Sequence, residues 1–324
     1  MKNVLVYIES VDEKVKKSSL EAVAFARSIA NRTGGICYAV AVGRNHSKLD
    51  QVGQAGANKV LHFDQDGFDI LNAMNVSTAL KKATEYTESD LIILPQSSLS
   101  ESIAGRLAIK LKAGVVSNVI ESPQDVDDFI LKISIFTGKA YSNVKIKTDK
   151  KILVIKKNAA GINFTNHSNA ADIEKLYVDF NSIDNTIERI QVEKSSGKVL
   201  LPEAEIVVSG GRGLKGPENW GIIEELAETL GAATGCSKPV SDMNWRPHHE
   251  HVGQTGVKVS PNLYIAIGIS GAIQHLAGIS SSKVIVAINK DSDAPIFKAA
   301  DYGIVGDAFE VVPKLIKAFK EALS

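Results

Sequence analysis

Residues 263–275 read LYIAIGISGAIQH, an aliphatic run followed by a glycine turn. The run Leu263–Ile269 shows no alternation of polar and apolar side chains, which is typical of a strand buried on both faces. We expect Ser270 to cap a helix that begins at Gly271 and leaves free backbone amides at the strand end. His275 would lie on the first turn of that helix and point along the same opening. This order of elements predicts an open sheet with a ligand at the carboxyl ends of its strands.

The segments around this stretch repeat the pattern. Further strands are expected at Glu205–Ser209, Lys283–Asn289 and Tyr302–Val305. Helices are expected at Glu218–Leu230 and at Val311–Leu323, with Pro313 in the first turn of the latter. We therefore predict a C-terminal parallel-sheet domain of the nucleotide-binding type, residues 204–324.

The first 200 residues predict a second α/β domain, with a β-rich extension that completes it. Aliphatic runs alternate with helical segments up to residue 111, which favours a parallel sheet with crossover helices. The expected strands are Val4–Ile8, Ile36–Val42, Lys59–Phe63 and Leu91–Leu94, and the expected helices include Ser18–Ala30 and Ile103–Leu111. Later runs show no helix between them: Phe129–Phe136, Val144–Ile146, Ile152–Ile155, Lys175–Phe180 and Thr186–Glu193. A linker is expected at Ser195–Gly197 and Leu201–Pro202, which places the domains at 1–200 and 204–324.

Composition excludes several classes of protein. Lysine plus arginine and aspartate plus glutamate each total 37, so the chain lacks the basic excess of a nucleic-acid-binding protein. The two cysteines, Cys37 and Cys236, lie far apart, which indicates neither a zinc site nor a disulfide framework but two buried side chains in a reducing compartment. No leader segment or run long enough to span a membrane is recognised, so we expect a cytoplasmic protein.

Glycine marks the C-terminal part as the place where a ligand binds, because 14 of the 25 glycines lie in residues 204–324. Residues 209–216 read SGGRGLKG, in which three glycines satisfy G-x-G-x-x-G. The acidic residue that a dinucleotide site needs after the next strand is missing from residues 232–238. Two interpretations stay open: a pyrophosphate cradle that includes Arg212, or a tight turn.

Other candidates carry weaker signals. Residues 252–256 (VGQTG) offer backbone amides and one hydroxyl to a flat polar ligand, although a loop turn would read the same. Asn289 and Asp307 follow two expected strands and suit a ribose or ribityl chain, or else they cap turns. Residues 248–251 (HHEH) lack the spacing of a metal site, and no G-x-S-x-G elbow is present. We therefore expect neither a metal nor a nucleophile.

Together these segments resemble the α subunit of electron transfer flavoproteins. The resemblance rests on VVSGGRGLKGPEN (207–219), HVGQTG (251–256), LYIAIGISGAIQHLAG (263–278) and VIVAINKDSDAPIFKAADYGIVGD (284–307), in the order that the family shows. It implies that the C-terminal domain holds one FAD, while the N-terminal domain faces a smaller β subunit.

The resemblance also implies roles for individual residues. Thr255 would lie near flavin N5, His275 near the pyrimidine carbonyl, and Asn289 and Asp307 along the nucleotide half. The complete set of implied FAD contacts is Arg212, Ser237, Lys238, Val252, Gly253, Gln254, Thr255, Ser270, Gly271, Ala272, Ile273, Gln274, His275, Asn289, Asp307 and Ala308. Lys238 stands where the family usually has an arginine over the flavin ring, so the charge is kept but the planar stacking group is lost. We expect Lys238 still to favour negative charge on the reduced flavin.

The implied function is electron transport, not conversion of an organic substrate. As a heterodimer with the β subunit, the protein would take electrons from dehydrogenases, such as the acyl-CoA dehydrogenases of fatty acid β-oxidation. It would pass them to a membrane-bound quinone reductase. Two alternatives remain: a nicotinamide-dependent dehydrogenase that uses the glycine loop, and a nucleotide-binding regulatory module without redox activity.

Overall fold

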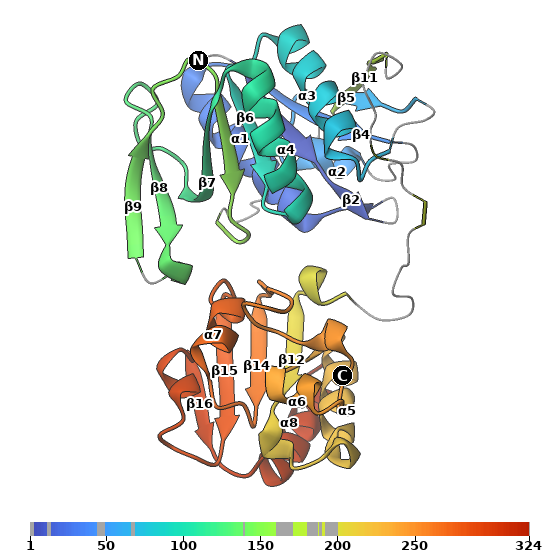
Figure 1. Ribbon diagram of the computed structural model, residues 1–324, viewed down its shortest axis with the longest axis vertical. Helices are drawn as coiled ribbons and strands as arrows, with labels where there is room; N and C mark the ends of the chain where they lie inside the picture. Colours follow the sequence, from blue (N-terminus) through green and yellow to red (C-terminus); the bar gives the residue numbers. More distant parts are fainter. Residues whose placement is uncertain are drawn as a thin grey trace. The chain divides into compact units, whose positions relative to one another are not determined.

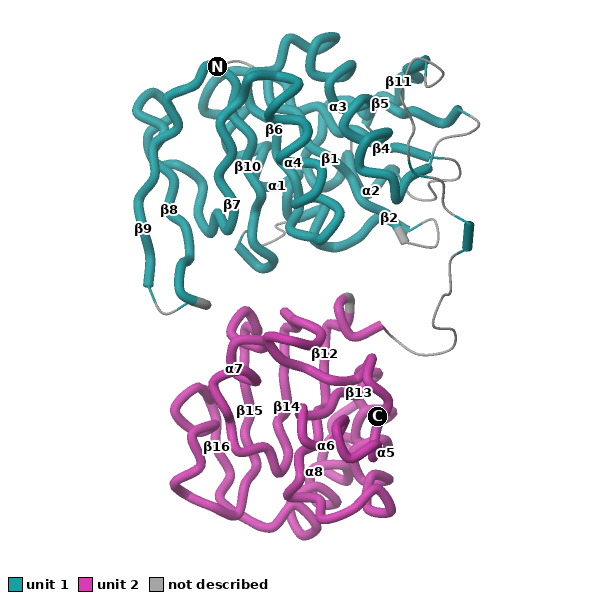
Figure 2. The backbone as a smooth tube through the Cα atoms, in the orientation of Figure 1, with its two compact units in different colours: residues 1–191 teal, residues 192–324 magenta. Residues whose placement is uncertain are grey.

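The computed structural model describes residues 3–11, 14–43, 49–65, 69–138, 140–159, 171–179, 187, 190–191 and 200–323. The chain divides into two compact units, Met1–Gln191 and Val192–Ser324, shown in different colours in Figure 2. Each unit has its own sheet and its own buried core, so each is described by itself. The predicted linker residues 195–197 lie outside the described residues.

The main sheet of unit 1 has nine strands among the described residues. Its strands are β1 (Val4–Ile8), β4 (Cys37–Val42), β5 (Lys59–Phe63), β6 (Leu91–Pro95), β7 (Gly114–Glu121), β8 (Ile130–Ile135), β9 (Ala140–Lys145), β10 (Lys151–Ile155) and β11 (Asp172–Lys175). Their order across the sheet is β11-β5-β4-β1-β6-β10-β7-β8-β9. A small antiparallel ribbon, β2 (Ser10–Val11) with β3 (Lys14–Val15), follows β1.

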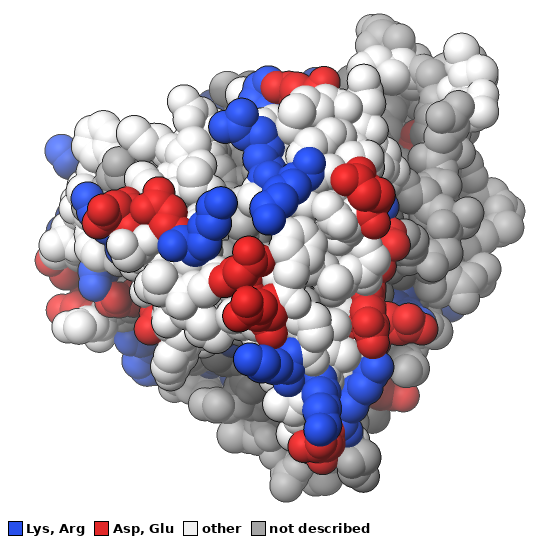
Figure 3. Space-filling model, turned by 90° about the horizontal axis from the view of Figure 1, so that it is seen from below, with Lys and Arg blue, Asp and Glu red and all other residues white. Residues whose placement is uncertain are grey.

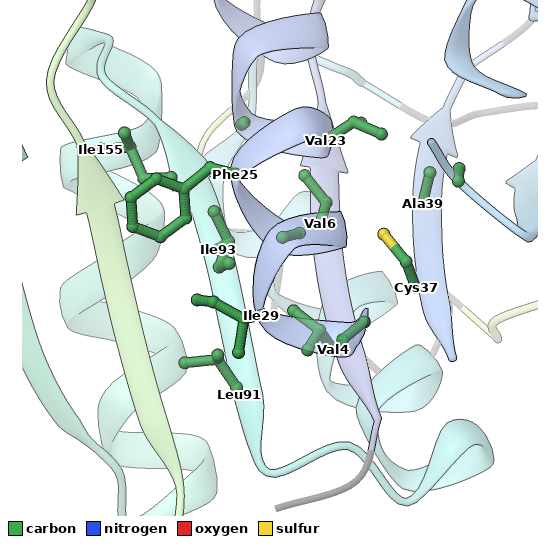
Figure 4. Close-up of a cluster of buried hydrophobic side chains, with 14 of the residues drawn as sticks. Val4, Val6, Val23, Phe25, Ile29, Cys37, Ala39, Leu91, Ile93 and Ile155 are labelled. Atoms are coloured by element: carbon green, nitrogen blue, oxygen red, sulfur yellow. The ribbon is translucent and has the colours of Figure 1, made fainter. Parts of the chain in front are cut away.

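Helices cover both faces of this sheet (Figure 1). Residues of α1 (Lys17–Thr33) and α2 (Asp50–Gln54) belong to the core on one face, and those of α3 (Ala73–Thr87) and α4 (Ser98–Leu111) to the core on the other. Figure 4 shows the first of these cores, where Phe25 and Ile29 of α1 lie over Ile93 of β6. Burial on both faces explains why β1, β4 and β6 carry no charged side chain and consist mostly of aliphatic residues.

The β-rich extension is confirmed, with changed boundaries. β8 pairs antiparallel with β7 and with β9, and β10 enters the sheet in parallel between β6 and β7. Strand β7 was not expected from the sequence, and the predicted strand Lys175–Phe180 is wrong because β11 ends at Lys175. Of the predicted strand 186–193, the described residues 187, 190 and 191 form no strand.

Unit 2 has one sheet among its described residues, and it is entirely parallel. Its strands are β12 (Ile206–Gly210), β13 (Ala233–Cys236), β14 (Leu263–Ile267), β15 (Val284–Asn289) and β16 (Tyr302–Val305), in the order β13-β12-β14-β15-β16. The chain passes from β12 to β13 on one side and to β14 on the other. Therefore the strand order reverses between β12 and β14, which is where open α/β sheets bind ligands.

Helices also flank this second sheet. α5 (Gly221–Leu230), α6 (Lys238–Asp242) and α8 (Ala308–Leu323) supply one core, and α7 (Ile273–Ile279) belongs to the other. The fold class predicted from the sequence, two α/β domains of which the second has a parallel sheet, is confirmed. The expected start of the last helix is wrong: α8 begins at Ala308, so Pro313 lies inside the helix and not in its first turn.

The surface carries both signs of charge. On the face drawn in Figure 3, lysine and arginine side chains form small groups beside aspartate and glutamate side chains. This mixture agrees with the formal net charge of zero. Attraction to a partner must therefore come from local patches rather than from the charge of the whole chain.

Candidate functional site

The candidate residues gather at one edge of the unit 2 sheet. Because all its strands are parallel, their carboxyl ends face the same way. The segments that follow these ends hold Arg212 after β12, Ser237 and Lys238 after β13, Ser270 to His275 after β14, Asn289 at the end of β15, and Asp307 and Ala308 after β16. Residues 252–255 join them, because Val252 N–H donates to the carbonyl of Cys236 at the end of β13 (2.9 Å).

The glycine loop packs against the end of β14. A Cβ added to Gly211 would lie 2.2 Å from the carbonyl oxygen of Gly268, and one added to Gly213 would lie 2.7 Å from its Cα. The N–H of Gly213 donates to the Gly268 carbonyl (3.0 Å), so this amide is already used. Close backbone packing therefore explains two glycines of the G-x-G-x-x-G pattern without a dinucleotide, while Arg212 next to them is exposed.

Lys238 is the first residue of α6, directly after the buried Ser237. Its ammonium lies 2.5 Å from the carboxylate of Asp242 on the same helix, and both side chains are more than half exposed. Exposed pairs of this kind contribute little stability. Lys238 can therefore leave Asp242 for a negatively charged ligand at small cost.

Residues 251–257 form a tight loop fastened at its base. Val257 N–H donates to the carbonyl of His251 (2.8 Å), and Gly253 N–H donates to that of Val257 (3.1 Å). Gln254 N–H donates to the carbonyl of Gln274 (2.7 Å), which ties the loop to α7. The side chains of Gln254 and Thr255 are exposed at the tip, where a ligand could reach them.

The prediction that Ser270 caps a helix from Gly271 is wrong. α7 begins at Ile273 after Ala272, and no side chain caps it. Gly271 has φ +86°, and a Cβ on it would lie 2.3 Å from the backbone nitrogen of Ile296. A positive φ is incompatible with a right-handed helix, so α7 does not begin at Gly271, and the close approach of Ile296 leaves room only for glycine. Ser270 is exposed and follows the carboxyl end of β14.

His275 lies on the first turn of α7, but it does not point along the opening as expected. Its ring is 5% exposed, and its Nε2 lies 3.0 Å from the hydroxyl of Tyr264 on β14. Burial lowers the pKa of His275 to about 4, so the ring is neutral at pH 7. Tyr264 is fully buried and was not among the site residues predicted from the sequence. A single tyrosine in an aliphatic strand does indicate a buried hydroxyl that needs a hydrogen-bond partner.

Asn289 and Asp307 both take part in local turns. The amide of Asn289 donates to the carbonyl of Ile269 (3.0 Å), which joins the ends of β15 and β14. The carboxylate of Asp307 accepts from Phe309 N–H (2.9 Å) at the start of α8, next to the buried Ala308. The turn interpretation is therefore realised for both, and each side chain is still partly exposed.

A network of hydrogen bonds and ion pairs around Arg246 connects residues 246–250, which precede the loop, to α5 and β13. Its guanidinium binds both carboxylate oxygens of Glu250 (2.7 Å each) and reaches Glu224 on α5 (2.8 Å). Glu250, 4% exposed, also accepts from Thr234 on β13 (3.1 Å). The sequence did not reveal this network, because an Arg–Glu pair four residues apart is ordinary on any polar surface.

The edge suits a large dinucleotide that carries a flat ring. Arg212 and Lys238 supply positive charge, which a pyrophosphate or another anionic group could use, and Thr255 and Ser270 carry exposed hydroxyl groups. Ile273, 68% exposed, offers apolar surface beside them. Among the described residues, no group of three metal-ligating side chains lies close enough to hold an ion.

Comparison with known sequences decides the family. Over 322 residues the chain is 38% identical to the electron transfer flavoprotein subunit alpha of Bacillus subtilis (strain 168), covering 99% of this chain and 98% of that protein. Residues 4–181 match the electron transfer flavoprotein domain, and residues 200–280 match the electron transfer flavoprotein FAD-binding domain. The chain belongs to the electron transfer flavoprotein α-subunit family.

Two further proteins are similar to this chain. The subunit alpha of Paracoccus denitrificans is 43% identical over 224 residues, which cover 69% of this chain and 71% of that protein. Protein FixB of Clostridium saccharobutylicum is 30% identical over 333 residues, covering 100% and 98%. The cofactor of this family's FAD-binding domain is FAD, and the residues of the sheet edge fit it. The individual FAD contacts stay predictions.

The matched FAD-binding segment contains β12, β13, β14 and α7, which build most of the sheet edge. Asn289 and Asp307 lie beyond this segment. Their predicted role as FAD contacts is supported by the resemblance to the family and by their place at the same edge of the sheet. In the described part of the chain, no helix is both long and apolar enough to cross a membrane.

Proposed function

We propose that this chain is the larger subunit of a heterodimeric electron carrier and holds FAD at the carboxyl edge of the unit 2 sheet. It would accept electrons from dehydrogenases, such as those that oxidise acyl-CoA, and deliver them to a membrane-bound quinone reductase. The observation that carries the proposal is the meeting of Arg212, Lys238 and Thr255 at one edge, within a matched FAD-binding domain. Bound FAD supplies one-electron and two-electron transfer.

The chain's own side chains would bind and tune the cofactor. Arg212 would neutralise the pyrophosphate, and Thr255 would present its hydroxyl to flavin N5. Lys238, once released from Asp242, would favour negative charge on the reduced ring. If so, Lys238→Ala lowers the flavin's reduction potentials, while Lys283→Ala, an exposed lysine at the opposite edge of the sheet, leaves them unchanged. Unchanged potentials in Lys238→Ala would refute this role.

Unit 1 would face the smaller subunit. Its β8–β9 hairpin supports this proposal, because Phe136 and Tyr141 are 76% and 61% exposed. Exposed aromatic side chains are enriched where proteins bind one another. Replacing both with serine should weaken binding of the smaller subunit; unchanged heterodimer formation would move the interface elsewhere on unit 1.

Copurification tests the whole proposal. The chain expressed with its β subunit should give a yellow heterodimer with flavin absorbance, and an acyl-CoA dehydrogenase with its substrate should bleach it. The chain alone should bind FAD poorly, because the partner completes the pocket. A colourless, nucleotide-free complex would rule the proposal out. Tight binding of NADH without flavin would instead support the dehydrogenase alternative, and adenine nucleotide binding without electron transfer would support a regulatory module.

A further inference from the structure

The His251 side chain is enclosed by its own loop. It is 2% exposed, and a Cβ added to Gly256 would lie 2.6 Å from its Nδ1, while one added to Gly253 would lie 3.3 Å from its Nε2. Both glycines therefore pack directly on the imidazole. Its Nδ1 is buried without a hydrogen-bond partner.

Movement of this ring must move the tip of the loop. The backbone of His251 pairs with Val257, and Gly253 closes the loop through the same residue. On the outer side, a Cβ on Gly278 of α7 would lie 2.5 Å from the Cα of Gly253, so the loop is wedged between the ring and the helix. Gln254 and Thr255 follow Gly253 directly in the chain, so a displacement of Gly253 shifts their backbone.

The surroundings of the ring disfavour a positive charge. The titratable groups that face it are His248 before it, Lys238 and Asp242 on α6, Cys236 on β13 and His275 on α7. Burial is the main cause that lowers the pKa of His251, His248 and Lys238 lower it further, and only Asp242 raises it. The imidazole is therefore neutral near pH 7, and folding disfavours its protonation as the pH falls below the ordinary histidine pKa of about 6.5.

We propose that His251 is a positioning residue for the FAD-facing tip of the loop, and that it holds Gln254 and Thr255 in place only while its imidazole is neutral. A protonated ring would need an acceptor at Nδ1, but this atom is buried without a partner and Gly256 packs directly against it. The ring must then leave the loop or draw water into it. This inference rests on the proposed function, because it concerns the hold on FAD.

The test measures the FAD dissociation constant of the heterodimer by flavin fluorescence between about pH 5 and pH 7.5. Wild type should lose affinity as the pH falls, by at most about tenfold per pH unit, the limit for one proton. His251→Gln keeps a polar side chain that does not titrate, so its profile should be flat. His249→Gln, an exposed neighbour, serves as the matched control and should follow wild type.

Each outcome separates the inference from the proposed function. A flat wild-type profile overturns the inference without any variant. A His251→Gln profile parallel to wild type overturns it too, since the histidine would then be merely structural. Both results leave FAD binding intact, whereas a heterodimer that binds no FAD at any pH refutes the proposed function itself. His275 does not interfere, because its pKa of about 4 lies below the measured range.

Discussion

Replacing Gly278 with alanine should push the loop of residues 251–257 away from α7. The added Cβ would lie 2.5 Å from the Cα of Gly253, 2.7 Å from its nitrogen and 2.9 Å from its carbonyl carbon. Because carbon atoms come no closer than about 3.5 Å in ordinary contact, helix and loop must separate by about 1 Å. The atoms closest to the added Cβ are backbone atoms of Gly253, so a change of side-chain rotamer cannot relieve the contact.

The strain outweighs the gain in helix propensity. Overpacking of this kind costs about 1–3 kcal/mol, while alanine is about 1 kcal/mol better than glycine inside a helix. Unit 2 should therefore lose up to roughly 2 kcal/mol of unfolding free energy, from the difference between these terms. FAD affinity of the heterodimer should fall as well, because Gln254 and Thr255 move with the loop.

The chain offers a direct assay for this change. Its two tryptophans, Trp220 and Trp245, both lie in unit 2, so tryptophan fluorescence during urea unfolding reports this unit. Gly221→Ala, at the first residue of α5, is the matched control, because an added Cβ meets nothing within 4 Å there. The control should be as stable as wild type or slightly more so. If Gly278→Ala unfolded at the same urea concentration as wild type, the close approach of helix and loop would be refuted.

Three further predictions concern buried groups. Tyr264→Phe leaves Nε2 of His275 without its partner and should lower unit 2 stability by about 1–3 kcal/mol in the same urea assay; no measurable loss would argue against the hydrogen bond. Arg246→Met strands the buried carboxylate of Glu250 and should cost about 3–5 kcal/mol, of which Glu250→Gln in the double variant recovers part; additive losses would contradict the coupling. Burial raises the pKa of both cysteine thiols to about 12, so they stay protonated near neutral pH. They should react with Ellman's reagent only in urea, and fast reaction of the folded chain would contradict their burial.

The sequence alone predicted the class of fold and the edge that holds the site. Apolar runs such as 4–8 and 263–267 are typical of strands buried on both faces, and the helices expected between them indicate that such strands are parallel. Once the strands are parallel, the polar residues after each of them, from Arg212 to Asp307, must meet at one edge. That conclusion needs no tertiary contact, because it follows from local hydrophobicity and chain direction.

Elements that depend on distant partners could not be predicted in this way. β13 is a four-residue strand containing a threonine and a glycine, and it becomes a strand only because it pairs with β12. β10 was predicted as the strand Ile152–Ile155, but its place in the sheet between β6 and β7, both of which precede it in the chain, was not. The local hydrophobic pattern predicts neither the formation of β13 nor the place of β10 in the sheet. Both depend on pairing with strands that are far away in the sequence.

The same division runs through the site. The sequence indicated which residues belong to the candidate site, because strand ends and glycine turns have local signatures. Tertiary structure decided how these residues are arranged. Gly271 packs against the backbone of Ile296, and α7 begins two residues later than expected. The buried His275 lies within hydrogen-bond distance of the Tyr264 hydroxyl. Tertiary structure also closed residues 251–257 around the imidazole of His251. These contacts join residues that are far apart in the sequence and are closely packed in the fold. A pattern within one segment of the sequence cannot predict them.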